Sequence, residues 1–190
     1  VNIDNKPLEF TIDDLKNDNR FYIDDATLCR LWANGGGDKY KVVFARVGMI
    51  MRSFEDKIIT LYDMDAFSYL QGTTDGVKRY HDYCLKHQPY NPNRNEDEFD
   101  KLIDKMKSFE YDIKRGAIIV NEENFILDGQ HRCCIILNRH GPFYKIPVVK
   151  CYSSGRHSVK HKVKIGFYKL KTLLRCIKEF LIRRKKTADN

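Results

Sequence analysis

The chain has 190 residues, of which 42% are hydrophobic, 12% aromatic and 32% charged, a composition that excludes a globally disordered protein. No apolar run reaches the roughly 18 residues of a membrane span and no signal-peptide block opens the chain, so we expect a soluble, cytoplasmic protein. The net charge of +8 is uneven: residues 153–190 hold 12 Lys and Arg against 2 Asp and Glu, which confines any nucleic-acid binding to this tail.

Two short helices are predicted between residues 10 and 32. Thr11 and Asp14 resemble a capping box at the start of the first one. The three glycines at 35–37 then predict a flexible connector, because no Lys-Ser/Thr pair follows them as in a Walker A phosphate loop.

Two strands and a helix are expected next. Segments 41–51 and 57–65 are rich in β-branched and aromatic residues, which favours strands. The segment 68–87 is predicted to end as a helix, because four apolar residues recur there at helical spacing. These are Val77, Tyr80, Cys84 and Leu85.

An amphipathic helix is predicted to begin after Asn95. Asn95 is a favourable N-cap, and the acidic residues 96–98 suit the positive end of the helix dipole. Apolar residues then repeat at i, i+3, i+4 and i+7, which indicates one buried face. They are Phe99, Leu102, Ile103, Met106 and Phe109.

The next segment reads as a hairpin, a turn, a helix and a strand. The ranges are 117–120 and 125–127 for the hairpin strands, 130–140 for the helix and 145–152 for the last strand. Four residues should face inward from the helix, and Gly141-Pro142 should end it. The inward residues are Cys133, Cys134, Ile136 and Leu137.

The six cysteines form no CxxC pair. Cys133 and Cys134 are adjacent, a spacing that suits neither a zinc site nor an ordinary disulfide. We therefore expect free thiols in a reducing compartment, several of them acting as small core residues.

The five residues 128–132 (DGQHR) between hairpin and helix carry chemically useful groups. A helix start offers unpaired N–H groups, and Gly129 permits close approach of an anion. Arg132 offers a planar fork for phosphate, and His131 can donate a hydrogen bond or exchange a proton. Asp128 suits a Mg²⁺ ligand or a catalytic base. The alternative is that Asp128 caps the helix and the next residues are ordinary surface residues.

This arrangement resembles the ParB/sulfiredoxin superfamily over residues 57–152. In that family a helix leads to a hairpin, and an acidic-Gly-x-His-Arg turn opens a helix that returns to a strand of the form "IPV". Sulfiredoxins carry a catalytic Cys where this chain has Gln130, which argues against sulfinic-acid reduction. The downstream DNA-reading helices of chromosome-partitioning ParB proteins are not present in this sequence. Within the superfamily, the sequence of the turn is most similar to the DGHHR motif of ParB-like free-serine kinases.

The resemblance implies an α/β fold of the α+β type, with a small mixed sheet and flanking helices. With the ParB/sulfiredoxin-like domain at 57–152, we expect two further parts: an N-terminal elaboration packed on the core (1–56) and a basic amphipathic tail (153–190). The sequence does not indicate the oligomeric state of the protein.

The resemblance also implies a kinase that uses ATP or ADP and Mg²⁺ to phosphorylate a small hydroxylated metabolite, an amino acid or a sugar. Asp128 would be the base or the Mg²⁺ ligand, and Gly129, Gln130, His131 and Arg132 would bind phosphates. The family also uses an upstream Glu, for which this chain offers Asp63, Asp65 or Asp75. Asp75 is taken as the second catalytic candidate, with a turn or N-cap role as its alternative. The alternative function is a non-catalytic nucleotide-binding module.

The tail from Ile165 predicts a basic amphipathic helix with one apolar stripe. The stripe comprises Leu170, Leu173, Leu174, Ile177, Phe180 and Leu181. Three uses are open: docking on its own domain, lying on an anionic membrane surface as a peripheral protein, and contacting nucleic-acid phosphates.

Overall fold

The computed structural model describes residues 9–10, 14–15, 19, 21–33, 39–54, 57–89, 95–107, 110–152 and 159–188. The predicted capping box at Thr11, the glycine connector at 35–37 and Phe109 lie outside these residues.

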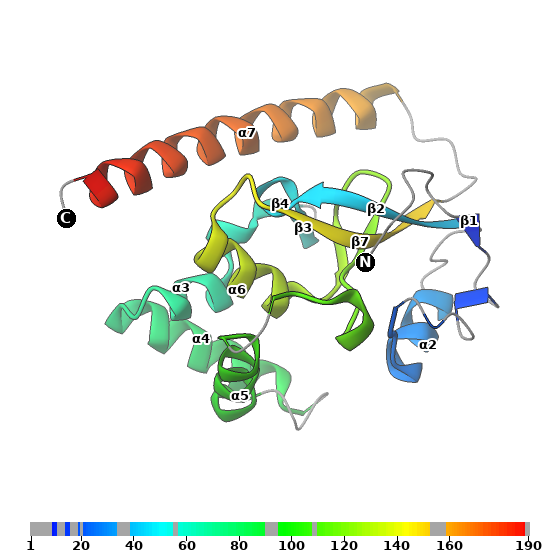
Figure 1. Cartoon of the computed structure of the whole chain (residues 1–190), viewed down its shortest axis with the longest axis horizontal. Helices are drawn as coiled ribbons and strands as arrows, with labels where there is room; N and C mark the ends of the chain where they lie inside the picture. Colours follow the sequence, from blue (N-terminus) through cyan, green and yellow to red (C-terminus); the bar gives the residue numbers. More distant parts are fainter. Residues whose placement is uncertain are drawn as a thin grey trace.

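A mixed five-stranded sheet forms the centre of the molecule (Figure 1). Its order is β1 (Glu9–Phe10), β2 (Lys39–Arg46), β7 (Lys145–Tyr152), β5 (Ile119–Asn121) and β6 (Ile126–Asp128). β2 is antiparallel to β7 from Lys39 opposite Tyr152 to Arg46 opposite Lys145, whereas β5 is parallel to β7. The predicted α/β fold class is confirmed. Because β2 comes from residues 1–56, the sheet joins both sides of the expected boundary at residue 57.

Both faces of the sheet are covered. Successive side chains of a strand point to opposite faces, so Ile146 and Val148 of β7 enter one apolar cluster while Val149 and Cys151 enter another. The first cluster includes residues of five helices, and the second includes Leu31 of α2 (Asp25–Ala33). The five helices are α3 (Asp65–Leu70), α4 (Thr74–His87), α5 (Glu96–Lys107), α6 (Gln130–His140) and α7 (Val159–Ala188).

The two predicted strands of the N-terminal half are shorter than expected. β2 ends at Arg46, and a 3₁₀ turn (Val47–Met49) leads into β3 (Met51–Phe54). In this turn Gly48 N donates to Pro142 O at 3.0 Å. β4 (Lys57–Thr60) pairs with β3 in a separate hairpin and ends where Asp63 accepts hydrogen bonds from Thr60.

The helices with local sequence signals are confirmed. Asn95 Oδ1 accepts from Glu98 N at 2.9 Å at the start of α5. The predicted bounds of α6 match the structure, and Gly141 ends it at φ +81°. Its inward residues are buried as predicted: Cys133, Cys134, Ile136 and Leu137.

α4 is also confirmed as a helix, but its apolar residues divide between core and solvent. Tyr80 and Cys84 are buried, whereas Val77 and Leu85 are 43% and 52% exposed. All six cysteines are free thiols, as predicted, and only Cys29 is exposed.

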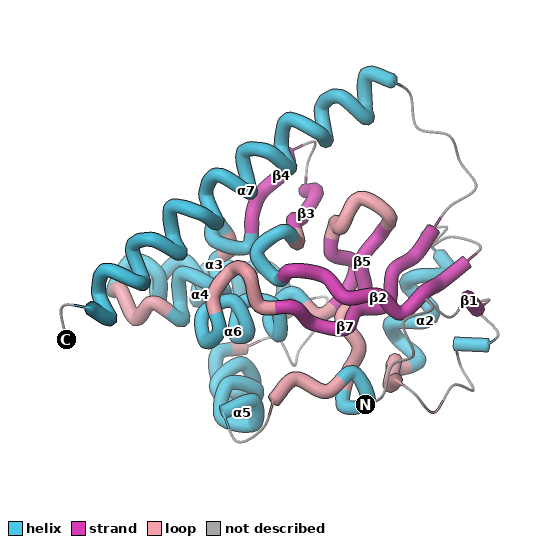
Figure 2. The backbone as a smooth tube through the Cα atoms, turned by 45° about the horizontal axis from the view of Figure 1, so that its top comes forward, coloured by secondary structure: helices cyan, strands magenta, loops and turns pink. Residues whose placement is uncertain are grey.

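The C-terminal helix α7 (Val159–Ala188) docks on the molecule along one outer edge (Figure 2). Thr172 and Cys176 are its buried centre, and Cys176 Sγ lies 3.2 Å from Gly48 O. Most of the predicted apolar stripe is therefore not the docking face: Leu174 and Leu181 are each 59% exposed, whereas Phe180 contacts Phe143. Over the described residues, no helix combines the length and apolarity needed to cross a bilayer.

Candidate functional site

The DGQHR turn forms where β6 ends and α6 begins. Gly129 is the N-cap of α6 at φ +86°, and no described side chain caps this helix. A β-carbon at Gly129 would lie 2.9 Å from Ile118 Cγ1, so both the backbone angle and the space require glycine. The uncapped first turn leaves N–H groups and the positive end of the helix dipole for an anion.

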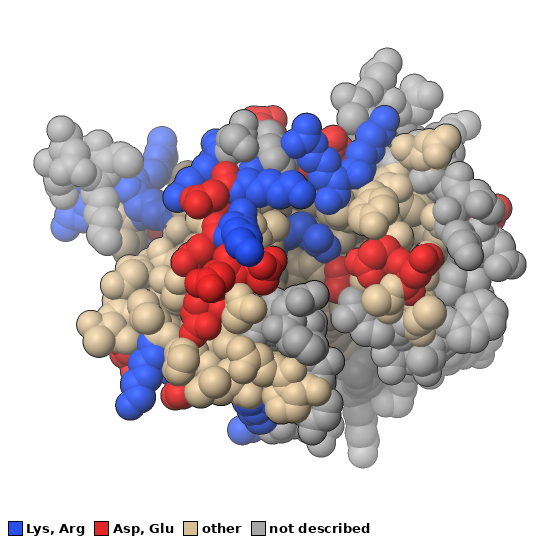
Figure 3. Space-filling view, turned by 90° about the horizontal axis from the view of Figure 1, so that it is seen from below, with Lys and Arg blue, Asp and Glu red and all other residues tan. Residues whose placement is uncertain are grey.

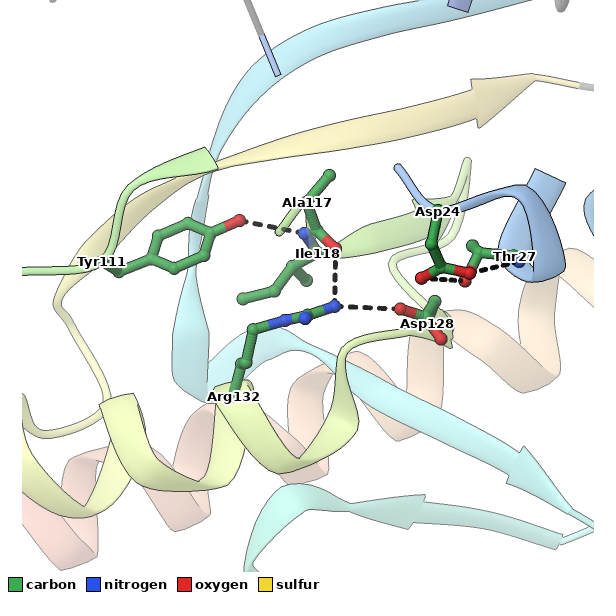
Figure 4. A network of polar contacts seen from close by, with 7 residues as sticks. All are labelled: Asp24, Thr27, Tyr111, Ala117, Ile118, Asp128 and Arg132. Carbon is green, nitrogen blue, oxygen red and sulfur yellow. Dashed lines mark hydrogen bonds and ion pairs between the residues drawn. The ribbon is translucent and has the colours of Figure 1, made fainter. Parts of the chain in front are cut away.

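Arg132 fixes the shape of the turn. Its Nη2 donates to Ala117 O and pairs with Asp128 Oδ2, each at 2.9 Å (Figure 4). The guanidinium is packed against glycine backbone, since a β-carbon at Gly116 would lie 2.7 Å from its Nη1. Its Nε is buried and finds no hydrogen-bond partner among the described residues. Arg132 thus joins α6, the end of β6 and the lead into β5.

The side chains of Gln130 and His131 turn away from the helix start toward neighbouring elements. Gln130 Oε1 accepts from Arg52 Nη1 at 2.8 Å, and its Nε2 donates to Tyr83 OH at 3.0 Å. His131 Nε2 lies 3.0 Å from Tyr80 OH. These contacts tie the turn to β3 and α4, so a phosphate at the helix start would meet the main chain of both residues.

Two pockets flank the turn. The pocket of about 530 Å³ is lined by all five turn residues together with Asp24 and Arg52. A pocket of about 370 Å³ lies on the other side and is lined by Tyr83 and by charged residues of both signs. Arg52 and Gln130 line both, so the hydrogen-bonded series Arg52–Gln130–Tyr83 separates the two pockets.

Asp24 is a site residue that sequence reasoning missed. Tyr22 N donates to Ile113 O at 3.0 Å and Tyr22 O accepts from Ala117 N at 2.8 Å, which places this segment beside the lead into β5. Asp24 and Asp128 therefore line the same pocket, and Figure 4 shows their carboxylates next to each other. In the sequence, Asp24 showed only the pattern of a helix N-cap residue.

The N-cap role of Asp24 is present in the structure. Its Oδ1 accepts from Thr27 N at 2.8 Å and its Oδ2 from Thr27 Oγ1 at 3.1 Å, at the start of α2. These contacts fix the carboxylate without using all of its acceptor capacity. The carboxylate is consequently held in place beside Asp128.

The three aspartates proposed from sequence lie elsewhere. Asp75 is 78% exposed, pairs with Arg79 at 3.0 Å, and is not among the residues that line either pocket beside the turn. Asp63 and Asp65 line the smaller pocket. The structure thus brings Asp24, from the segment before β2, to the pocket that Asp128 lines.

The described side chains could hold a magnesium ion only together with oxygen atoms of a bound phosphate and water. Among the described residues, no group of three or more His, Cys, Asp or Glu side chains could hold a metal ion. Mg²⁺ is commonly bound by one or two carboxylates, phosphate oxygens and water. Asp128, as one carboxylate beside an uncapped helix start, fits that pattern.

No family model matches this chain, and no similar protein was found among curated proteins or solved structures. Membership of the ParB/sulfiredoxin superfamily therefore stays a prediction from the turn and its setting.

Proposed function

We propose that this protein is a phosphotransferase that moves a phosphoryl group from ATP or ADP to a hydroxyl of a small metabolite, an amino acid or a sugar. The observation that carries the proposal is the juxtaposition of Asp24 and Asp128 in the pocket at the uncapped start of α6. A helix start attracts phosphate, whereas paired carboxylates repel it unless a cation or a proton transfer is involved. A phosphate-binding helix start with two carboxylates beside it therefore supports phosphoryl transfer.

Phosphate binding is assigned to the main chain and to one arginine. The amides of Gln130 and His131 provide the N–H groups, since both side chains are engaged with β3 and α4. Gly129 lets an oxygen approach the backbone. Arg52 lines the pocket from β3 and adds positive charge. Arg132 is a positioning residue, because its Nη2 is committed to Asp128 and Ala117 O.

The two carboxylates take different roles. We assign Asp128 the role of cation ligand, with Arg132 holding its carboxylate in place. Among the described donors, Asp24 accepts from the neutral groups of Thr27, and we assign it the role of proton acceptor. The acceptor hydroxyl gives its proton to Asp24 as its oxygen bonds to phosphorus, and the bond from phosphorus to the nucleotide oxygen breaks. Bound Mg²⁺ would neutralise the phosphate charge.

The proposal is tested by nucleotide binding and turnover. We expect ATP or ADP to raise the melting temperature in the presence of Mg²⁺, and Asp128→Asn to weaken this binding at least about tenfold. Asp24→Asn should retain binding but slow nucleotide consumption, with a panel of amino acids and sugars as acceptors, by roughly 10²–10⁴.

Two aspartates serve as matched controls. Asp75→Asn tests the candidate that sequence alone suggested, and Asp104→Asn changes an exposed residue of α5. Both should behave like the unaltered protein. Equal shifts in the Asp128 variant and these controls would overturn the proposed site. Binding without turnover in any acceptor would favour the alternative, a non-catalytic nucleotide-binding module.

A further inference from the structure

α7 carries apolar residues on two opposite faces, and only one of them is buried. The docked face contains Ile165, Thr172 and Cys176, which are 4%, 2% and 0% exposed. Arg175 on its flank pairs with Asp63, and Arg183 Nη1 donates to Asn138 O at 2.9 Å. These contacts settle how the helix is rotated against the domain.

The opposite face presents a continuous row of large apolar side chains to solvent. Its members follow one another at intervals of three and four residues, so they lie along one side of the helix. They are Phe167, Leu170, Leu174, Ile177 and Leu181, and their exposed fractions are 67%, 55%, 59%, 41% and 59%. We call these five residues the outer stripe. A contiguous apolar row of this kind marks an interaction site.

Lysines border the outer stripe along one edge. Each lies three or four residues from a stripe residue, and all four are exposed: Lys164, Lys171, Lys178 and Lys185. Glu179 is the acidic residue among the described side chains of α7, and it is half-buried rather than part of this face. The surface that the helix presents is therefore an apolar stripe with positive charge along one edge.

We propose that the outer stripe of α7 lies on a membrane surface that contains anionic lipid. Apolar side chains enter the boundary between headgroups and acyl chains, and the flanking lysines contact lipid phosphates. Such a helix lies in the plane of the membrane and does not cross it, in keeping with its charge.

The position of α7 in the molecule permits this contact. The helix runs along an outer edge in both ribbon views, so a flat surface can reach its whole length (Figures 1 and 2). The face that is seen from below, away from α7, carries acidic side chains together with Lys and Arg (Figure 3). The attraction of α7 to an anionic surface therefore comes from the exposed lysines along its outer stripe.

The charges of α7 disfavour two other occupants. A second copy in antiparallel pairing would bring the two lysine rows together, and the stripe has no acidic residues to offset them. Nucleic acid would use the lysines, but its phosphate backbone offers no partner for five apolar side chains. A membrane surface with anionic lipid offers an apolar region to the outer stripe and phosphates to the lysines.

Flotation of the full chain with lipid vesicles tests the proposal. We expect binding to vesicles of phosphatidylcholine mixed with phosphatidylglycerol, weaker binding to phosphatidylcholine alone, and a decrease with salt. The double variants Leu170→Gln/Leu174→Gln and Lys171→Gln/Lys178→Gln should each lower the partition coefficient by roughly tenfold or more. All four side chains are exposed, so melting temperatures should stay close to that of the unaltered chain.

Controls of the same chemistry lie on other helices. Leu85→Gln removes an exposed leucine of α4, and Lys78→Gln/Lys101→Gln removes two exposed lysines; both should float normally. No binding to anionic vesicles, or equal binding by stripe variants and controls, would overturn the proposal. A dimer in light scattering that the leucine variant abolishes would assign the stripe to a second copy instead. Salt-sensitive duplex DNA binding unaffected by that variant, with no flotation, would assign the tail to nucleic acid.

Discussion

Arg132 and the two glycines beside it decide the shape of the proposed site. The guanidinium fits only because Gly116 and Gly129 have no side chains, and it links Asp128 to Ala117 O. His131 and Gln130 are held by Tyr80, Tyr83 and Arg52 in the same way. A site of this kind is preorganised, because each side chain that could move is fixed by a partner.

Gly129→Ala should destabilise the protein by about 2–3 kcal/mol, because a left-handed backbone and a contact with Ile118 act together. Gly72→Ala is the matched control: its φ is +66°, but no atom lies within 4 Å of the added β-carbon. It should cost only about 1 kcal/mol. Urea unfolding measures both values. Equal losses would mean that the contact with Ile118 is relieved by relaxation and that backbone strain alone acts.

At the level of elements, α7 is held by polar contacts at its centre as well as by apolar burial. Arg175 Nη1 pairs with Asp63 and lies 3.1 Å from Thr60 Oγ1, at the junction of β4 and the next turn. The guanidinium also stacks 5.0 Å from the centre of the Tyr62 ring. This cluster fixes the rotation of the helix and thereby exposes the outer stripe.

The Arg175–Asp63 pair should make α7 docking sensitive to acid. Burial would raise the pKa of the Asp63 carboxyl, but hydrogen bonds from Arg175 and Thr60 outweigh it and hold the pKa below its ordinary value of 3.8. A lowered pKa in the folded state adds stability above pH 3.8, and this contribution is lost as pH falls through the folded value.

Asp63→Asn should therefore cost about 0.5–1 kcal/mol at neutral pH, a small amount because the pair is partly exposed. The difference between the two proteins should shrink as pH falls below 3.8 and vanish below the folded pKa. Urea unfolding across pH measures it. Asp104→Asn, whose pair with Lys107 is exposed, should show little effect. A difference that persists in strong acid would show that the variant perturbs something other than this ion pair.

Across the whole molecule, segments far apart in sequence build both the site and the outer edge. β2 and β7 share a full-length antiparallel pairing, and the segment before β2 brings Asp24 to the turn. Gly48, Pro142 and Cys176 meet at one point, where a β-carbon at Gly48 would lie 2.6 Å from Pro142 Cβ and 2.7 Å from Cys176 Sγ. The docking of α7 thus depends on the turn after β2.

Thiol labelling should report this docking. Cys176 is buried, and burial raises its pKa to about 11, so it should label far more slowly than the exposed Cys29. Gly48→Ala should accelerate labelling of Cys176 by roughly tenfold or more, since overpacking costs about 1–3 kcal/mol. Gly166→Ala on α7 meets no atom within 4 Å and should leave the rate unchanged. Mass spectrometry identifies the labelled cysteine; unchanged Cys176 labelling in the Gly48 variant would contradict this packing.

The sequence by itself determined the features that depend on near neighbours. Caps and periodicity located α5, α6 and β7, and the order of hairpin, turn and helix placed Asp128 through Arg132 at a helix start. The tertiary structure alone decided what depends on distant segments: the bend at Gly48, the neighbours of Gln130 and His131, and the meeting of Asp24 with Asp128. It also turned the outer stripe of α7 toward solvent. Local patterns fix where a helix lies and which of its faces is apolar, but the face that is buried is chosen by the contacts that the rest of the chain offers.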